Sequence, residues 1–219
     1  MVLSIQVEQV TIPADKGSVD GVLWLPPDPV GIVLFADSRG GYRVKPPIDY
    51  VGSVLRNSRL GTLWLDLMPP RHGIGQEPAG DTELLTRRLD AACSWLREND
   101  ATRELPVGLF GASNGAAAVL QLAANLGATV FAVVLRGARA DLAAYGSLGK
   151  VNAPTLLIVG SLDDSMVVAN RGVYAALRCK KRLEIIPGAT HNFEEPGSLE
   201  VVARLARGWF LQNVRVKHV

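Results

Sequence analysis

Ser113 stands in a Gly-x-Ser-x-Gly pentapeptide that runs from Gly111 to Gly115. The residues before the pentapeptide are apolar and favour a strand, whereas the alanine-rich residues after it favour a helix. A tight turn between such a strand and helix lifts the serine Oγ out at the end of the strand. The two glycines remove side chains where the backbones pass close together around a strained serine. The spacing therefore predicts a serine nucleophile.

A serine hydroxyl is a poor nucleophile near neutral pH, so it needs a base to take its proton and a carboxylate to orient that base. The strand–turn–helix around Ser113 is typical of the nucleophile elbow of the α/β-hydrolases, in which an acid and then a histidine follow along the chain. Two later loops fit this order, each after an apolar segment, and they contain Asp163, Asp164 and His191. We expect both loops at the rim of the sheet that carries the elbow.

His191 is the favoured base among the three histidines of the chain. His218 is the penultimate residue, where fraying prevents precise geometry. His72 precedes the nucleophile, in a Pro/Gly-rich stretch at residues 68–80 that we expect to be irregular and to overhang the site as a small lid. The alternative role for His191 is that of a loop histidine that is hydrogen-bonded to the backbone. We favour the catalytic role, because His191 follows Ser113 and an aspartate in the order that the elbow predicts.

Asp163 and Asp164 compete for the role of the acid. Either one also suits the turn or the N-cap of a helix that we expect to begin near Met166, since aspartate is a good capping residue. We favour Asp163 as the acid and Asp164 as the cap. The acid would hold the His191 ring in one tautomer and stabilise the imidazolium that forms during the reaction.

Short apolar runs alternate with amphipathic segments after an opening hairpin of two predicted edge strands, which are joined by a turn at residues 13–17. Continuous runs of Val, Ile and Leu are typical of strands covered on both faces. This alternation predicts an α/β fold with a mostly parallel sheet. The expected strands are residues 4–12, 18–25, 30–36, 61–67, 105–110, 130–135, 155–159 and 182–186. The expected helices are residues 47–57, 82–97, 115–126, 167–177 and 199–211.

The composition limits the classes of partner. With 219 residues, of which 48% are hydrophobic, the chain can bury one core, and we expect a single domain over residues 1–219. A net charge of +2 without a basic block argues against nucleic acid. No apolar run approaches the ~20 residues that span a bilayer. The first residues alternate like a strand and lack the pattern of a signal peptide, so the default localisation is cytoplasmic.

No metal or cofactor is expected. The sequence has no His-x-x-x-His or Cys-x-x-Cys pair, so metal-ligand spacing is missing. The only cysteines are Cys93, on the apolar face of a predicted helix, and Cys179, beside two lysines. We interpret both as packing or surface thiols rather than catalytic ones. The oligomeric state stays open, because an apolar C-terminal helix suits either a core or a dimer face.

These motifs resemble those of small α/β-hydrolases of the dienelactone-hydrolase-like group. The resemblance is carried by residues 34–36, 61–67, 105–117, 153–160 and 186–197, which span nearly the whole chain from the third strand onward. It implies the α/β-hydrolase fold, with a central sheet of about eight strands, helices on both faces and a minimal lid. It is strongest to a subgroup in which some members are fused to a phosphoribosyltransferase domain, and we expect no such second domain within these 219 residues.

Two features depart from this group. Dienelactone hydrolases proper have a cysteine at the elbow where this chain has Ser113, which favours ester or acyl chemistry in general. Relatives carry His-Gly after the third strand, where this chain reads Asp37-Ser38. The expected oxyanion hole consists of the N–H of Asn114 and an N–H of the Asp37–Ser38 turn. The carboxylate of Asp37 would oppose the developing negative charge unless an arginine pairs with it.

Arg39 and Arg43 follow that turn and admit two interpretations. A guanidinium could recognise a carboxylate or phosphate on a substrate. The alternative, which we favour, is that both are surface arginines or neutralise the preceding aspartate.

The first functional hypothesis is a cytosolic serine hydrolase of a small-molecule ester, lactone or thioester, with Ser113, Asp163 and His191 as its triad. Transfer of the acyl group to another acceptor would use the same residues. The second is a hydrolase fold kept as a non-catalytic ligand-binding or partner-docking module, suggested by the altered loop after the third strand. A third, by analogy with the fused relatives, is a subunit that works beside a separate phosphoribosyltransferase chain.

Overall fold

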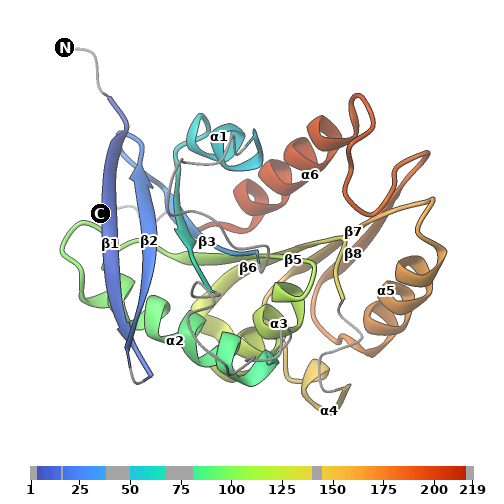
Figure 1. The fold of residues 1–219 in the computed structure, drawn as a ribbon, viewed down its shortest axis with the longest axis horizontal. Coiled ribbons are helices and arrows are strands. Elements are labelled where there is room, and N and C mark those ends of the chain that lie inside the picture. Colours follow the sequence, from blue (N-terminus) through green and yellow to red (C-terminus); the bar gives the residue numbers. More distant parts are fainter. Residues whose placement is uncertain (1–3, 16, 38–49, 68–80, 140–144, 216–219) are drawn as a thin grey trace, which may run out of the picture.

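An eight-stranded sheet with helices on both faces forms the computed structural model of the protein, which describes residues 4–15, 17–37, 50–67, 81–139 and 145–215 (Figure 1). The strand order is β1-β2-β4-β3-β5-β6-β7-β8, and pairing is parallel except where β2 meets β1 and β4. This is the predicted α/β-hydrolase architecture. The strands are β1 (Gln6–Ala14), β2 (Gly17–Leu25), β3 (Gly31–Asp37), β4 (Leu60–Leu65), β5 (Val107–Ala112), β6 (Val130–Arg136), β7 (Thr155–Gly160) and β8 (Lys181–Ile186).

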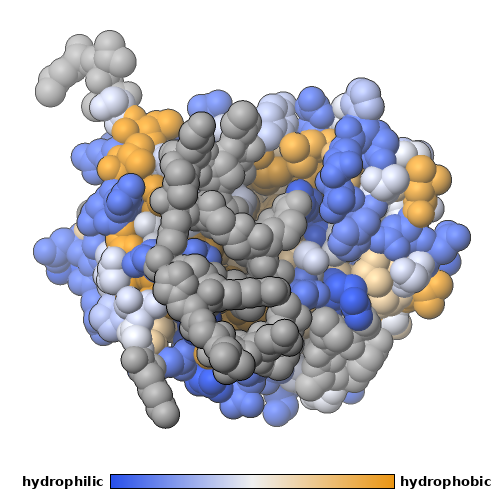
Figure 2. Space-filling view, viewed as in Figure 1, coloured by the Kyte–Doolittle hydropathy of each residue, from blue (hydrophilic) through white to orange (hydrophobic). Residues whose placement is uncertain are grey.

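The predicted place of the opening hairpin is only half right. β1 lies at one edge of the sheet, but β2 is an inner strand, because it also pairs with β4 through residues such as Gly21 and Trp24. Local sequence patterns show that two strands form a hairpin. They do not show which distant strand, here β4, pairs with the free side of that hairpin, because this pairing depends on long-range packing. Figure 2 shows hydrophobic residues gathered where β1 begins. Ile5 and Val7 are exposed by 40% and 59%.

Helices cover both faces of the sheet, as Figure 1 shows. α1 and α6 pack on one face, and α2 to α5 lie on the other. The single-turn α4 and a 3-10 turn at Gly127–Thr129 were not predicted, since four residues or fewer show no helical period. The helices are α1 (Tyr50–Arg56), α2 (Thr82–Glu98), α3 (Gly115–Leu126), α4 (Tyr145–Leu148), α5 (Asp164–Ala176) and α6 (Ser198–Asn213).

The central strands are apolar on both sides because both sides are covered. Every residue of β4 and β7 is buried. On the α1/α6 face, the ring of Phe35 stacks on Trp64 and Phe110 at centroid distances of 4.1 and 4.8 Å. Such aromatic contacts bury large apolar areas. They join β3 to the strands on either side and so fix the strand that carries the elbow.

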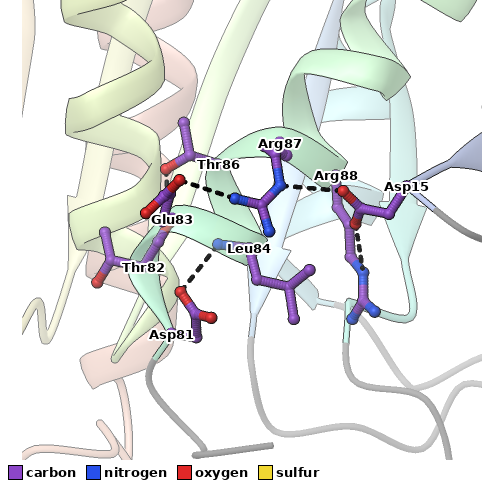
Figure 3. Close-up of polar contacts among 8 residues, drawn as sticks. All are labelled: Asp15, Asp81, Thr82, Glu83, Leu84, Thr86, Arg87 and Arg88. Carbon is purple, nitrogen blue, oxygen red and sulfur yellow. Dashed lines mark hydrogen bonds and ion pairs between the residues drawn. The ribbon is translucent and has the colours of Figure 1, made fainter.

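The tip of the β1–β2 hairpin is tied to α2 (Figure 3). Asp15 Oδ1 accepts a bond from Arg87 Nε at 3.0 Å, and its Oδ2 lies 3.6 Å from Arg88 Nε. Arg88 also donates to the Leu67 carbonyl at 2.6 Å, just after β4. The helix itself starts at the N-cap Asp81, whose side chain accepts from the Leu84 N–H. These contacts hold the antiparallel end of the sheet against α2.

None of the helices in the described part of the chain combines the length and apolar character that crossing a bilayer needs. Among the same residues, no group of three or more potential ligand side chains is arranged to hold a metal ion.

Candidate active site

Ser113 forms the turn between β5 and α3, with a φ of +50° that non-glycine residues rarely adopt. This is the strained strand-to-helix turn that the pentapeptide predicts. A Cβ on Gly115 would lie 2.3 Å from the Ala36 carbonyl oxygen, and one on Gly111 would lie 2.8 Å from Ala116 Cα. Both glycines are therefore needed for the close approach of β3, β5 and α3.

The turn at Ser113 is held by backbone hydrogen bonds from β6 and the residues after it. The Ser113 N–H donates to the Arg136 carbonyl at 3.4 Å, and the Arg139 N–H donates to the Ser113 carbonyl at 3.1 Å. The Ala116 N–H also donates to that carbonyl, at 3.3 Å. Both the N–H and the carbonyl of Ser113 are thus hydrogen-bonded to the end of β6 or to the residues that follow it.

Asp163 and His191 are in direct contact. His191 Nδ1 and Asp163 Oδ2 are 2.8 Å apart, and the two side chains are 39% and 16% exposed. Asp163 follows β7 and His191 follows β8, so both come from loops past the carboxyl ends of parallel strands. This contact would fix the tautomer of the ring, with the proton on Nδ1 and a free lone pair on Nε2.

Asp163 is also the N-cap of α5, which corrects the prediction that Asp164 is the cap. Its Oδ1 accepts from the Met166 N–H at 3.3 Å and from the Ser165 hydroxyl at 3.1 Å. Asp164 is the first residue of the helix instead. A carboxylate has two oxygens, so one side chain serves both purposes. Sequence reasoning assigned the two purposes to two residues.

The pKa of Asp163 is lowered from its ordinary value. Partial burial works against the charged form, but hydrogen bonds from His191, the Met166 N–H and Ser165 together outweigh it. Asp163 is therefore ionised near neutral pH and can stabilise a positive charge on His191.

The two loops that hold this pair are joined by further bonds. A Cβ on Gly160 would lie 2.3 Å from the Ala189 carbonyl oxygen, and the Leu162 N–H donates to the same oxygen at 3.0 Å. The Gly188 N–H donates to Ser161 Oγ at 2.9 Å. The acid and the base are thus on one cross-linked unit.

Glu195 ties down the loop around His191. Its Oε1 accepts from the Thr190 N–H at 3.1 Å, and the Ser198 N–H donates to its backbone carbonyl at 3.0 Å. The pKa of Glu195 is lowered chiefly by a hydrogen bond from the Thr190 side chain, with smaller effects from the Glu195 and Thr190 N–H groups and from the Ser198 side chain. Within this loop Phe193 is buried, at a φ of +59°. Sequence reasoning did not single out Glu195, since no motif marks a bond between two turns of one loop.

His191 also packs against the residue that follows β6. A Cβ on Gly137 would lie 3.0 Å from the His191 carbonyl oxygen and 3.6 Å from its Cε1. Gly137 directly follows Arg136, whose carbonyl accepts from Ser113. The imidazole therefore lies at the same rim as the elbow, beside the segment that supports Ser113.

Several predicted residues lie outside the described part of the chain: Ser38, Arg39, Arg43, His72, His218 and the expected lid at residues 68–80. Asp37 is the last residue of β3, and its backbone is in register with Ala112, next to the elbow. Asn114 follows Ser113 in αR conformation and precedes α3. The start of the predicted oxyanion loop is thus adjacent to the elbow strand.

Neither cysteine adjoins this rim. Cys93 is buried in α2, and burial raises the pKa of its thiol to about 12. Cys179 precedes β8 and its Sγ lies 3.7 Å from Thr155 Oγ1, at the opposite end of β7 from Asp163. Cys93 is a packing thiol, as predicted.

Comparison with solved structures identifies the family. A dienelactone hydrolase from Anabaena variabilis superposes with a TM-score of 0.87 and is 41% identical, over 96% of this chain and 99% of that one. The chain belongs to the dienelactone hydrolase family. The predicted family and the α/β-hydrolase fold are confirmed. No family model matches the sequence.

More distant structures share the fold of this chain. The esterase Est1E from Butyrivibrio proteoclasticus is 16% identical over 94% of the chain and 98% of its own, with a TM-score of 0.77. The esterase domain of a Rhodothermus marinus protein is 20% identical over 96% of the chain and all of its own (100%), with a TM-score of 0.75.

Two curated relatives of this chain come from Mycobacterium tuberculosis, strains CDC 1551 and H37Rv. Each is 44% identical over 207 residues, which is 94% of the chain, and each is named "putative phosphoribosyl transferase". The chain spans about half the length of these relatives, 46%.

Proposed function

We propose that this protein cleaves a small ester, lactone or thioester through an acyl-enzyme formed on Ser113. The observation that carries the proposal is the 2.8 Å contact between Asp163 and His191 at the rim where Ser113 is held in a strained turn. Together these residues match the nucleophile, base and orienting acid that acyl transfer requires.

In the first half-reaction, Ser113 Oγ attacks the acyl carbon while His191 Nε2 takes the hydroxyl proton. The negative charge moves to the carbonyl oxygen, which the N–H of Asn114 and an N–H of the Asp37–Ser38 turn would hold. Collapse of this intermediate breaks the bond to the leaving alcohol or thiol, and His191 returns the proton to that group. Asp163 stabilises the imidazolium meanwhile.

In the second half-reaction, water attacks the acyl-enzyme. His191 takes a proton from the water, the carboxylic acid leaves, and Ser113 Oγ regains its proton. A lactone differs only in that its leaving group stays tethered to the acyl chain. Acceptance of another nucleophile in place of water would give acyl transfer by the same residues.

A fluorophosphonate probe tests this proposal, because it labels only activated serines. We expect stoichiometric labelling of the purified protein at Ser113, located by mass spectrometry. Ser113→Ala should abolish labelling and His191→Ala should slow it by ~10³ or more. Ser94→Ala, on the outer part of α2, serves as the matched control and should label like the wild type.

Failure of the folded wild type to label would contradict the proposal. The fold would then serve as a non-catalytic ligand-binding or partner-docking module. Positive labelling would be followed by steady-state assays with small p-nitrophenyl esters, thioesters and lactones, with and without alcohol acceptors. These assays separate hydrolysis from acyl transfer.

A further inference from the structure

Asn170 is a buried polar residue on the inner side of α5, with no exposed surface (0%). Its Nδ2 donates to the Ala138 carbonyl at 3.0 Å and to the Met166 carbonyl at 2.8 Å. Its Oδ1 is buried and accepts no hydrogen bond from the described residues. An unsatisfied buried amide oxygen destabilises a fold, and an apolar residue of similar size would avoid that cost. The contact with Ala138 is therefore the feature that an asparagine provides here.

Ala138 is the middle of residues 137–139, which we call the β6-exit segment. The Gly137 N–H donates to the Ile158 carbonyl at 2.9 Å, which anchors the start of the segment to β7. At its other end, the Arg139 N–H donates to the Ser113 carbonyl. Asn170 supplies the bond to the carbonyl between these two anchors.

The β6-exit segment contacts both of the groups that the proposed reaction brings together. It bonds to the backbone of Ser113 through Arg139, and Gly137 packs directly on His191. Gly137 has a φ of +51°, so the segment turns sharply at the point where the histidine lies. A shift of this segment would move the nucleophile and the base relative to one another.

Asn170 also connects this segment to the acid through α5. The Met166 carbonyl accepts from Asn170, and the Met166 N–H donates to Asp163 Oδ1. One residue of the first helical turn, Met166, thus links the Asp163 carboxylate to the Asn170 amide through its N–H and its carbonyl. The hydrogen bonds of Asn170 and Asp163 thus connect the β6-exit segment, the loop after β7 and the loop that carries His191.

We propose that Asn170 is a positioning residue, which fixes the β6-exit segment against α5 and thereby holds Ser113 and His191 in their relative places. The inference rests on the proposed function, since it assigns a role in the reactivity of Ser113. Asn170 touches no reacting atom and acts through the Ala138 carbonyl. Small displacements of reacting groups have large effects on rate, so its loss should lower reactivity without removing any member of the triad.

Asn170→Leu tests the proposal, with Val173→Ala as the matched control. Leucine fills a similar volume and removes both the donor and the unsatisfied oxygen. Val173 is fully buried one turn further along α5 and packs in the core, so its truncation loosens the helix but leaves the hydrogen bond from Asn170 to the Ala138 carbonyl in place. Three quantities are measured for each: the rate constant of fluorophosphonate labelling, the melting temperature, and amide hydrogen exchange of peptides that cover residues 111–116 and 135–139.

We expect Asn170→Leu to label at least tenfold more slowly and to exchange faster at residues 135–139, with a melting temperature above that of Val173→Ala. We expect Val173→Ala to melt lower while it labels at the wild-type rate under conditions where it is folded. Should Asn170→Leu not fold, Asn170→Ser takes its place. A serine can still bond the carbonyl four residues back but is too short to reach Ala138.

Unchanged labelling in a folded Asn170 variant would overturn the inference while the proposed function stands. Faster exchange with unchanged labelling would reduce Asn170 to a structural residue and overturn it equally. A wild type that does not label overturns the proposed function and this inference together.

Discussion

Asp163 contacts His191 through one carboxylate oxygen and starts α5 with the other. The Oδ2 atom lies 2.8 Å from His191 Nδ1, and Oδ1 accepts the Met166 N–H at 3.3 Å. The orientation of the proposed base and the beginning of a helix therefore depend on one side chain. Substitutions at this position can separate the two effects.

Asp163→Asn should preserve the N-cap of α5 but abolish most of the reactivity of Ser113. Asparagine caps helices as well as aspartate does, so this variant should lose only the part of the stability that depends on the charge of the carboxylate. Its amide cannot hold the productive tautomer of His191, and we expect the labelling rate of Ser113 to fall by ~10³–10⁴. Asp163→Ala should lose the same activity and in addition about 1 kcal/mol of unfolding free energy, measured by urea denaturation. Asp164→Asn is the control. Equal stability of the Asn and Ala variants would contradict the capping role.

Acidic pH should lower the unfolding free energy of the protein, because it protonates Asp163. Its pKa is lower in the folded state than the ~3.9 of an unfolded chain. This carboxylate therefore stabilises the fold above that value, and its contribution is lost as pH falls toward the folded pKa.

We thus expect the unfolding free energy of the wild type, relative to Asp163→Asn, to be constant from about pH 5 to 7 and to shrink below about pH 4. Urea titrations of both proteins across this range give the difference directly. A difference that grows on acidification would contradict the lowered pKa.

Glu195 should affect rate more than binding. Glu195→Ala removes the acceptor for the Thr190 N–H and frees the loop next to His191, so we expect kcat to fall by up to about a hundredfold with KM little changed. Glu195→Gln keeps an acceptor oxygen and should recover most of that rate. Steady-state kinetics on a small ester provide the measurement, and equal loss in both variants would show that the charge of Glu195 matters rather than its hydrogen bond.

Gly115→Ala should be strongly destabilising, because its Cβ would lie 2.3 Å from the Ala36 backbone oxygen, which belongs to β3. We expect a loss of about 1–3 kcal/mol and of Ser113 labelling, since the elbow must shift. Gly208→Ala, within α6, meets nothing within 4 Å and should gain roughly 0.5–1 kcal/mol. Thermal and urea unfolding of the pair check both signs. A tolerated alanine at position 115 would mean that β3 and α3 can separate.

The sequence predicts all eight strands and the five longer helices, because buried parallel strands are continuous apolar runs and the helices show an amphipathic period. It also predicts that Asp163 and His191 each follow the carboxyl end of a strand, and the structure adds that these two strands, β7 and β8, are neighbours. The remainder depends on contacts between distant residues. No periodic pattern in the sequence marks three of these features: the inner position of β2, the two contacts of the Asp163 carboxylate, and the hydrogen bond from Asn170 to Ala138.

β5 lies between β3 and β6, and the turn at its end is bonded to Arg136 and Arg139. Because a positive φ at a serine is unfavourable, that turn persists only when those later residues are in place. A growing chain in which β6 has not yet docked therefore has no means of holding Ser113 in its strained form. His191 is synthesised later still. If Ser113 is the proposed nucleophile, it therefore becomes reactive only once β6 and the His191 loop are in place, and labelling at Ser113 then also reports how much of a preparation has folded.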